Sequence, residues 1–466
     1  MNYISRVLLL LLFASSTLSA QKISFKINGY TEGYGKMIGM YADANYFCDS
    51  AKINTDGSMV FFKEEGYKAG LFYLMMPDET YVQFLVPDKN PITISATKDD
   101  YINTLQSSQS LDNQLFFDNQ RKQAAIEKRF NAVSGDMKKY TRGSADFVKL
   151  QQEQTAILAE RDATVGDLKK NHPTSFFTHF KLGGQNPKLR YVLQANGSLD
   201  SQMTMYNYRI DYWNDFDFTD GRLVRTPVFQ NKLKKYIQEL TPQVPDSVIK
   251  SADYLISRCA ANKDLHSVAI NWIAYNYKPS IGKLMDCDAV YSHLVLKYFK
   301  VESDLGIPAE DIASARKSAT DMIPSLLGKI GQDIVAGDKN GQMKSIYGLK
   351  ANFTVVFIYN PDCEHCQEET PRLRKVYDQY KSKGLEVYSI ASAAKDKKEW
   401  QDFANKYGIN WTDVWDPELK SRYFEKYFID ITPELYLLDR NRKIIAKNLK
   451  PNQLAEVLEF EMAKMN

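Results

Sequence analysis

The alternation of apolar and polar residues predicts short β-strands in the first part of the chain. The segment Lys22–Ile27 alternates strictly, which is typical of a strand with one buried face. Further β-branched and aromatic runs, separated by Gly, Asp and Pro turns, stand at residues 59–62, 70–75, 81–86 and 92–95. Strands of this length and spacing predict a small antiparallel β-sandwich, which we assign to residues 21–110.

From residue 111 to residue 327 the apolar residues recur with the period of a helix. Two long runs, 113–130 and 146–168, are rich in Gln, Lys, Glu and Ala. Shorter helical runs follow at residues 228–240, 245–261, 265–276, 289–299 and 308–322. Successive helices joined by loops predict an all-α middle domain.

The last part of the chain, residues 328–466, alternates strands with helices. A β-branched and aromatic strand at 354–359 precedes a helical segment, and a second strand and helix follow at 385–390 and 398–407. Another strand, 434–438, lies near the end of the chain. This order predicts an α/β domain, so the whole chain is expected to be multidomain.

The chain length, the net charge and residues 1–20 limit the classes of function that the protein could have. A chain of 466 residues exceeds one ordinary core, and a net charge of +3 gives no reason to expect a nucleic-acid partner. Residues 1–20 combine Arg6, a short apolar run and a small-residue region, which predicts a signal peptide cut near Ala20. Because the apolar run is shorter than the roughly 20 residues of a membrane span, we expect an exported, periplasmic protein that does not span the membrane.

The strongest chemical signal is a pair of cysteines, Cys363 and Cys366, between the strand at 354–359 and the following helix. A helix N-terminus favours the thiolate, because its free N–H groups and dipole stabilise negative charge. The two-residue spacing lets the second sulfur attack a mixed disulfide formed by the first. We therefore predict thiol–disulfide exchange, with Cys363 as the attacking thiol and Cys366 as the resolving thiol.

The other three cysteines, Cys48, Cys259 and Cys287, are expected to be buried free thiols, although a Cys259–Cys287 bridge remains an alternative. A zinc site would need two further ligands beside the cysteine pair, and neither the cysteines nor the histidines have the required spacing. We expect neither a metal ion nor a cofactor.

Several segments together resemble a known family. They are Cys363-Glu364-His365-Cys366, Pro371, Thr432-Pro433 and Tyr436-Leu437-Leu438-Asp439. In this order they resemble the TlpA/ResA-like exported thiol–disulfide oxidoreductases, which implies a thioredoxin fold for residues 328–466. The resemblance also implies a cis bond before Pro433, against the disulfide, in a backbone segment that pairs with substrate. The two preceding domains resemble uncharacterised domains of exported bacterial proteins and carry no known chemistry.

The resemblance assigns candidate roles to residues of the site, and it also shows where this sequence departs from thioredoxin. Phe357 stands where thioredoxin has a buried Asp, whereas Glu369 matches a Glu of the TlpA/ResA-like proteins and is the candidate for proton transfer with Cys366. Ordinary N-terminal helix charge is the alternative role of Glu369. Asp362 replaces the usual Trp, so the substrate-facing surface formed with Thr432 and Pro433 differs from that of thioredoxin.

These observations predict a periplasmic enzyme that exchanges disulfides with envelope proteins, with reduction as the preferred direction. His365 is the candidate group that stabilises the Cys363 thiolate, and because this would raise the reduction potential, the direction stays open. The expected partners are the thiols and disulfides of envelope proteins and a membrane or periplasmic electron donor. The alternative is a non-catalytic thioredoxin-fold adaptor or binding protein of the cell envelope.

Overall fold

The computed structural model describes residues 20–279, 281–301 and 305–464. The described residues form two compact units, divided between residues 236 and 237, and each is described separately below. The predicted signal peptide lies outside the described residues except for Ala20. Among the helices of the described ranges, none has both the length and the apolar character needed to cross a bilayer.

The first unit begins with two four-stranded sheets that form the predicted sandwich. Their orders are β4-β1-β7-β8 and β3-β2-β5-β6. Neighbouring strands are antiparallel except for the parallel pair β1–β7. Alternate residues of β1, among them Ile23, Phe25 and Ile27, are buried in the core, as the alternation predicted. The strands are β1 (Gln21–Asn28), β2 (Tyr34–Tyr41), β3 (Ala44–Lys52), β4 (Ser58–Lys63), β5 (Gly70–Met75), β6 (Tyr81–Val86), β7 (Ile92–Thr97) and β8 (Gln106–Ser107).

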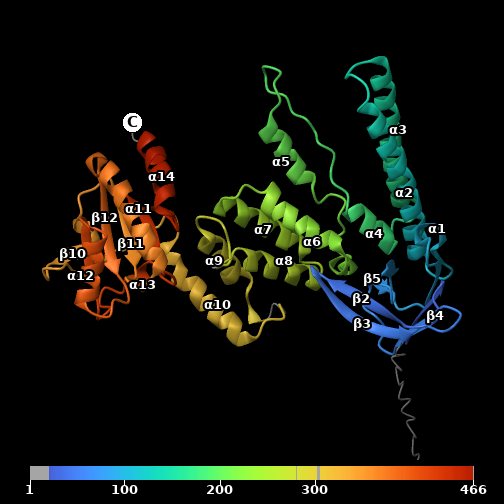
Figure 1. Cartoon of the computed structure of the whole chain (residues 1–466), viewed down its shortest axis with the longest axis horizontal. Helices are drawn as coiled ribbons and strands as arrows, with labels where there is room; N and C mark the ends of the chain where they lie inside the picture. The colour runs from blue at the N-terminus through green and yellow to red at the C-terminus, as the bar shows by residue number, and fades with distance from the viewer. Residues whose placement is uncertain (1–19, 280, 302–304, 465–466) are drawn as a thin grey trace, which may run out of the picture. The chain divides into compact units, whose positions relative to one another are not determined.

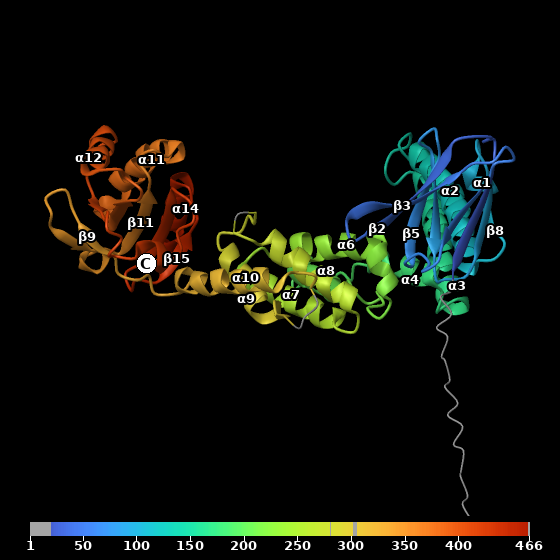
Figure 2. The ribbon, with the colours of Figure 1, turned by 90° about the horizontal axis from the view of Figure 1, so that it is seen from below.

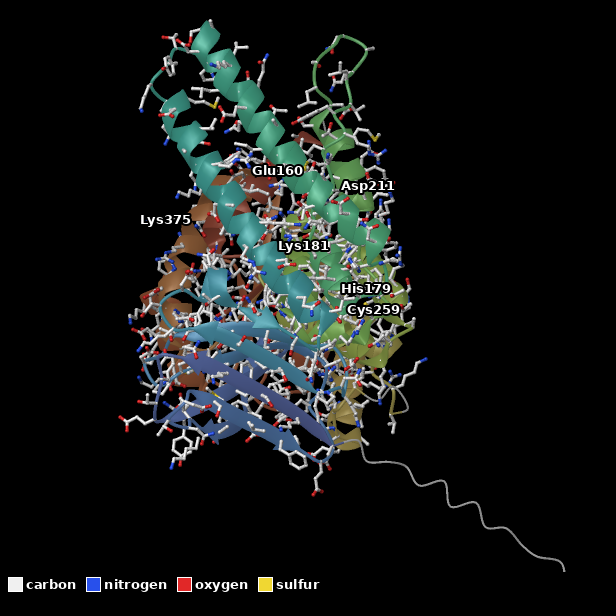
Figure 3. All side chains as sticks on the ribbon, turned by 90° about the vertical axis from the view of Figure 1, so that its right-hand side faces the viewer. Glu160, His179, Lys181, Asp211, Cys259 and Lys375 are labelled. Carbon is white, nitrogen blue, oxygen red and sulfur yellow. The ribbon has the colours of Figure 1, made fainter. Side chains whose placement is uncertain are left out.

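Helices follow the sandwich in the first unit. Helices α2 and α3 pack side by side, as Figure 3 shows around Glu160, which pairs with Arg129 across the hairpin at 2.8 Å. The side chain of Asn113 joins the start of α2 to the sheet, because it exchanges two hydrogen bonds with the backbone of Leu85 in β6. The helical elements are α1 (Tyr101–Thr104), α2 (Leu111–Met137), α3 (Ala145–Asn171), α4 (Phe176–Gly183), α5 (Ser201–Asp211), η1 (Gly221–Arg225) and α6 (Pro227–Lys234), and η2 (Lys235–Leu240) spans the boundary between the two units.

The second unit begins with helices that continue the all-α region. They are α7 (Pro245–Cys259), α8 (Lys263–Asn276), α9 (Cys287–Tyr298), α10 (Ala309–Met322) and η4 (Ile323–Ser325). Asn262 caps α8 and Asp286 caps α9, each through a side-chain oxygen that accepts backbone N–H groups of the first turn. The all-α middle region is thus confirmed.

A seven-stranded mixed sheet follows in the second unit, in the order β10-β9-β13-β12-β11-β14-β15. Strand β11 lies near its centre, parallel to β12 and antiparallel to β14. All seven residues of β11 are buried, because helices cover both faces of the sheet. The strands are β9 (Val335–Gly337), β10 (Met343–Ser345), β11 (Phe353–Tyr359), β12 (Leu385–Ala391), β13 (Thr412–Trp415), β14 (Glu434–Asp439) and β15 (Ile444–Lys447).

Two layers of helices enclose this sheet. Helices α11 (Glu364–Tyr380), α12 (Lys397–Lys406) and α14 (Pro451–Ala463) pack on the face that carries Phe357 and Tyr359. Helix α13 (Tyr423–Lys426) packs on the opposite face, and the short helices η5 (Ile346–Gly348) and η6 (Lys381–Lys383) complete the domain. Helices α11 and α14 lie side by side in both views of Figures 1 and 2. The sheet with its two layers confirms the predicted multidomain fold class with a C-terminal thioredoxin fold.

A glycine separates α11 and η6 from the next strand. Gly384 follows directly and has a φ of +93°, a region of backbone space that favours glycine. A Cβ atom at this position would lie 2.5 Å from the side-chain nitrogen of Asn352, so both the backbone and the space around it require glycine. The tight turn lets β12 begin at once beside β11.

A buried ion pair joins helix α9 to the end of the sheet. The ammonium of Lys447, at the end of β15, is fully buried and pairs with Asp288 of α9, while Asp286 lies 3.9 Å away. Asp286 also accepts backbone N–H groups from Ala289 and Leu327. The ammonium and these carboxyl groups therefore position the start of α9 against the thioredoxin fold.

We predict that Lys447→Met lowers the free energy of unfolding of the second unit by about 3–5 kcal/mol, because it leaves buried carboxyl groups without their cation. Urea denaturation of the full chain, followed by tryptophan fluorescence, measures the change. The matched control is Lys443→Met, because Lys443 is exposed just before the same strand and its loss is expected to cost less than about 0.5 kcal/mol. Equal stability of the two variants would contradict the role of Lys447.

Candidate active site

Cys363 lies at the N-terminus of helix α11, directly after the turn that follows β11. It is the N-cap residue, and the backbone N–H of Cys366 donates a hydrogen bond to its sulfur at 3.4 Å. The turn is closed by a hydrogen bond of 3.0 Å from the Cys363 N–H to the carbonyl of Asn360. The sulfur thus lies where the free N–H groups of a 17-residue helix concentrate positive potential.

The two thiols of the pair have different surroundings. Cys363 is partly exposed, whereas Cys366 is fully buried. Burial tends to raise the pKa of Cys363, but hydrogen bonds from the thiol and the N–H of Cys366 outweigh it, so the pKa lies below its usual value. Burial raises the pKa of Cys366 to about 12, and the neighbouring Cys363 adds to the rise. Cys363 is therefore the more reactive sulfur.

The loop before β14 contacts the Cys363 thiol. The Thr432–Pro433 peptide bond is cis, as the family resemblance implied. The thiol of Cys363 donates a hydrogen bond of 3.3 Å to the carbonyl oxygen of Thr432. The register of β11 with β14, which pairs Ile358 with Glu434, brings this loop to the end of the strand that leads to the cysteines.

Glu369 lies on α11, one turn after Cys366, and is 8% exposed. One carboxylate oxygen accepts a hydrogen bond of 2.5 Å from Arg372, and the other has no partner among the described residues. No hydrogen bond between Glu369 and either sulfur is found in the described part of the chain. The structure therefore places the free Oε2 of Glu369 near the pair without joining the two.

The remaining predicted residues of the site lie at its exposed rim. His365 is exposed and lines a cavity beside the cysteines. Asp362 is also exposed, and Lys395 donates a hydrogen bond of 2.7 Å to its carboxylate. That ammonium lowers the pKa of Asp362.

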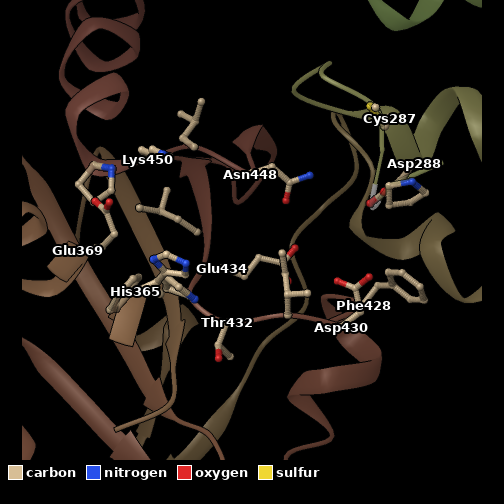
Figure 4. A pocket seen from close by; sticks show the side chains of 18 of the residues that line it. Cys287, Asp288, His365, Glu369, Phe428, Asp430, Thr432, Glu434, Asn448 and Lys450 are labelled. Carbon is tan, nitrogen blue, oxygen red and sulfur yellow. The ribbon is translucent and has the colours of Figure 1, made fainter. Parts of the chain in front are cut away.

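A cavity of about 560 Å³ adjoins the Thr432–Pro433 loop. Residues of the loop and of α11 line one part of it, and residues near the start of α9 line another (Figure 4). Within it, Glu434 is 7% exposed; its Oε1 accepts a hydrogen bond of 2.9 Å from Tyr436, while Oε2 has no partner in the described residues. Burial raises the pKa of Glu434 to about 8, although Lys447 opposes the rise. Sequence reasoning did not select Glu434, although a charged residue at the start of an apolar strand, directly after Pro433, was a usable signal.

A second buried carboxyl group lies on the other side of β11. Asp413 of β13 accepts hydrogen bonds from Tyr359 (3.1 Å), Ser389 (2.5 Å) and Trp400 (2.6 Å). Burial raises the pKa of Asp413 to about 6, and these three donors limit the rise. Sequence reasoning missed this group, because nothing in the local pattern around residue 413 distinguishes it.

The three other cysteines are free thiols, and the Cys259–Cys287 bridge that the sequence left open is absent. Cys259 and Cys287 are buried, as expected. Cys48 is only partly buried, which corrects the expectation for this residue: it lies on β3, an edge strand of its sheet, whose side chains are mostly exposed. Within the described ranges, no group of three or more His, Cys, Asp or Glu side chains is arranged to hold a metal ion.

Known proteins resemble parts of the chain. Residues 327–447 match the model of the AhpC/TSA family. The thiol-disulfide oxidoreductase ResA of Bacillus thuringiensis (strain Al Hakam) is 24% identical over 139 residues, which are 30% of this chain and 78% of the relative. The ResA of Bacillus subtilis (strain 168) is 24% identical over 118 residues, or 25% of this chain and 64% of the relative. Residues 327–447 form a thioredoxin-like domain that is similar to thiol–disulfide oxidoreductases.

A second family model and several solved structures also match parts of the chain. Residues 198–307 match a domain of unknown function, DUF5106. Among solved structures, a thioredoxin-like protein from Bacteroides caccae is 16% identical, with a TM-score of 0.47 over 59% of this chain and 99% of its own. A domain of a possible thiol-disulfide isomerase from Cytophaga hutchinsonii is 31% identical, with a TM-score of 0.28 over 30% of this chain and 95% of its own.

We predict that iodoacetamide modifies Cys363 of the reduced native protein with an apparent pKa below that of an ordinary cysteine, because hydrogen bonds stabilise the thiolate. The alkylation rate should therefore rise with pH, reach half its maximum at this lowered pKa and level off above it. Cys366 should stay unmodified until the protein unfolds. Mass mapping of the alkylated peptides measures both rates, and Cys363→Ser should remove the fast phase. Faster modification of Cys366 would contradict the assignment.

We predict that Asp413 makes the protein less stable as the pH rises. The folded state holds the Asp413 proton up to a pH of about 6, whereas the unfolded state releases it near 3.8. Between these values the folded state binds more protons, so the free energy of unfolding falls with rising pH, by at most about 3 kcal/mol. Urea denaturation from about pH 4.5 to 7.5 should show this fall in the wild type and lose it in Asp413→Asn. The exposed control Asp378→Asn should keep the wild-type slope.

Proposed function

We propose that the chain reduces disulfides of envelope proteins through Cys363 and Cys366. The observation that carries the proposal is the asymmetry of the pair: a partly exposed thiol of lowered pKa at a helix N-terminus, and a fully buried thiol behind it. A thiol that attacks an external disulfide must be reachable and ionised, whereas the resolving thiol needs only to reach the first sulfur.

The exchange proceeds in two displacements. The Cys363 thiolate attacks one sulfur of the substrate disulfide, forms a mixed disulfide and releases the other substrate sulfur as a thiolate, which takes up a proton. Cys366 then loses its proton and attacks the sulfur of Cys363, which releases the second substrate thiol and leaves a Cys363–Cys366 disulfide. Two electrons have passed to the substrate, and an external dithiol donor, membrane-bound or periplasmic, restores the reduced pair.

The neighbouring residues have supporting roles in this proposal. Glu369 accepts the proton of Cys366: its free Oε2 supports that role, whereas its ion pair with Arg372 favours ordinary helix charge. His365 stabilises the Cys363 thiolate from the rim. Thr432, Pro433 and Asp362 form the surface that meets the substrate, which the contact between Cys363 and the Thr432 carbonyl supports.

The proposed location is the periplasm. The signal-peptide pattern of residues 1–20, with cleavage near Ala20, supports export. An exported protein would meet substrates that contain disulfides, because oxidising compartments are where disulfides persist.

A non-catalytic adaptor is the second candidate. One observation favours it: the α/β domain is preceded by more than 300 residues of sandwich and helices, part of which matches a domain of unknown function. In that case the cysteine pair would be incidental, and the sandwich and helical regions would bind an envelope protein or a ligand.

Reduction of insulin disulfides by dithiothreitol tests the two candidates. We predict that the wild type accelerates the reaction, that Cys363→Ser abolishes the acceleration, and that Cys366→Ser accumulates a mixed disulfide visible by mass spectrometry. Cys48→Ser is the matched control and should keep wild-type turnover, since Cys48 lies in the sandwich. No acceleration by the wild type, or full turnover by Cys363→Ser, would favour the adaptor.

The reduction potential of the pair against glutathione decides the direction. A value near −270 mV, as in thioredoxin, supports a reductant, and a value near −120 mV, as in DsbA, supports an oxidant. The proposed direction, reduction of the substrate, can be wrong even when the exchange chemistry is right. This measurement is therefore separate from the turnover assay.

A further inference from the structure

We propose that the cavity beside Thr432 and Pro433 is a specificity pocket that binds a lysine or arginine side chain of the substrate protein, close to its reactive cysteine. This inference deepens the proposed function and rests on it. It concerns which disulfides the Cys363–Cys366 pair attacks, rather than how the exchange proceeds.

The cavity lies where a bound substrate would extend. Thr432 lines it and accepts the hydrogen bond of the Cys363 thiol at 3.3 Å, so a substrate cysteine joined to Cys363 would have neighbouring residues at the cavity. In Figure 4, Glu434 lies in the middle of the cavity, with His365 and Glu369 on one side and Asp288 on the other. The start of α9 thus supplies a wall that the thioredoxin fold alone would lack.

The acidic groups at this place outnumber the cations that pair with them. Lys447 faces Asp286, Asp288 and Glu434, and Asp430 stands beside Asp288 at the exposed mouth. In the described part of the chain, the other cations that line the cavity do not neutralise these four carboxyl groups. Arg372 pairs with Glu369, whereas Lys283 and Lys450 are exposed and form no ion pair with these carboxyl groups.

Glu434 is the group that points to a ligand. Its side chain is more than nine-tenths buried, and its Oε2 lacks a hydrogen-bond partner among the described residues. A buried carboxyl oxygen without a partner is costly, and an ammonium or guanidinium group would supply the missing charge-assisted hydrogen bond. Burial is the first cause of the raised pKa of Glu434 and of Asp430, and a cation bound beside them would favour the charged form of both carboxyl groups.

The walls of the cavity suit the stem of a basic side chain. They include the apolar residues Leu284, Phe357, Phe428, Leu435 and Leu449. Lysine and arginine place their methylene groups on apolar surface while the charged end reaches a polar group. A neutral side chain would leave Glu434 unpaired, and an acidic side chain would be repelled, so the pocket discriminates by charge.

The test uses reduced full-length protein and disulfide-linked dimers of short peptides, acetylated and amidated, with lysine, norleucine or glutamate on either side of the cysteine. The second-order rate of each peptide is divided by its rate with dithiothreitol, which removes the effect of the neighbour on the intrinsic reactivity of the disulfide. At about pH 9, where Glu434 has lost its proton, we expect this normalised rate to be about tenfold higher for lysine than for norleucine, and lowest for glutamate.

Glu434→Gln should bring the lysine-to-norleucine ratio to within about twofold of unity, since a charge-assisted hydrogen bond is lost. Glutamine matches the shape of the protonated acid, so the fold is expected to be kept, and the norleucine rate reports on it. Asp430→Asn, at the exposed mouth, should lower the ratio partly. The matched control is Glu418→Gln, because Glu418 is exposed and does not line the cavity.

The pH dependence of the ratio gives a second readout. Because the ratio cancels the ionisation of Cys363, it should rise between about pH 7 and 9 as Glu434 loses its proton, whose pKa lies near 8. The charged and titratable groups around Glu434 are Lys447 of β15, Tyr436 of β14, Asp430 and Asp288 of α9. The other walls of the cavity add His365, Glu368, Glu369 and Arg372 of α11, together with Lys283 and Lys450. Glu434→Gln should make the ratio independent of pH.

Three outcomes separate the inference from the proposed function. A wild-type ratio near unity, or a high ratio that survives in Glu434→Gln, overturns the pocket but leaves thiol–disulfide exchange intact. Failure of the wild type to reduce even the norleucine peptide overturns both. A high ratio that is lost in Glu434→Gln but kept in Glu418→Gln supports the pocket.

Discussion

The buried ammonium of Lys447 is the constraint on which the architecture around the site depends. It lies at the end of β15 and pairs with carboxyl groups at the start of α9, where both ends of the interaction are excluded from water. A buried charge is tolerated only when its partner is in place, so this pair holds the helical segment and the thioredoxin fold in one arrangement. The wall that α9 contributes to the cavity follows directly from this arrangement.

The cysteine pair depends on a different constraint, the junction between β11 and α11. Strand β11 is buried on both faces and ends at Tyr359, and the chain turns there at the edge of the sheet. The helix that follows has Cys363 as its N-cap residue. One sulfur therefore lies at the helix N-terminus and the other inside the first turn. The opposite pKa shifts of the two thiols are consequences of this placement, since one gains hydrogen bonds and the other is desolvated.

The domain also shows how a buried carboxyl group can come from another strand. The sequence has Phe357 where thioredoxin has a buried Asp, and this predicted a site without that group. Asp413 of β13 nevertheless places a buried carboxylate beneath the sheet, tied to Tyr359 just before the active-site turn. Its position depends on the packing of Trp400 and Ser389 around it, which supplies the donors that a buried carboxylate requires.

The sequence by itself determined the order of the three regions and the strand and helix around Cys363, whereas the Thr432–Pro433 loop was assigned through the family resemblance. These features are local. Hydrophobic period, turn residues and cysteine spacing extend over a few residues, so they can be recognised before the fold is known. Only the tertiary structure decided that Glu434 faces a cavity, that Lys447 meets Asp288 across 159 positions of sequence, and that Asp413 lies behind Tyr359. Contacts of this kind produce no periodic pattern in the sequence, because they depend on which faces pack together after the strands have paired. The reactive thiol could therefore be predicted from the sequence, whereas the charges that surround the neighbouring cavity were set by the packing of α9 against the sheet.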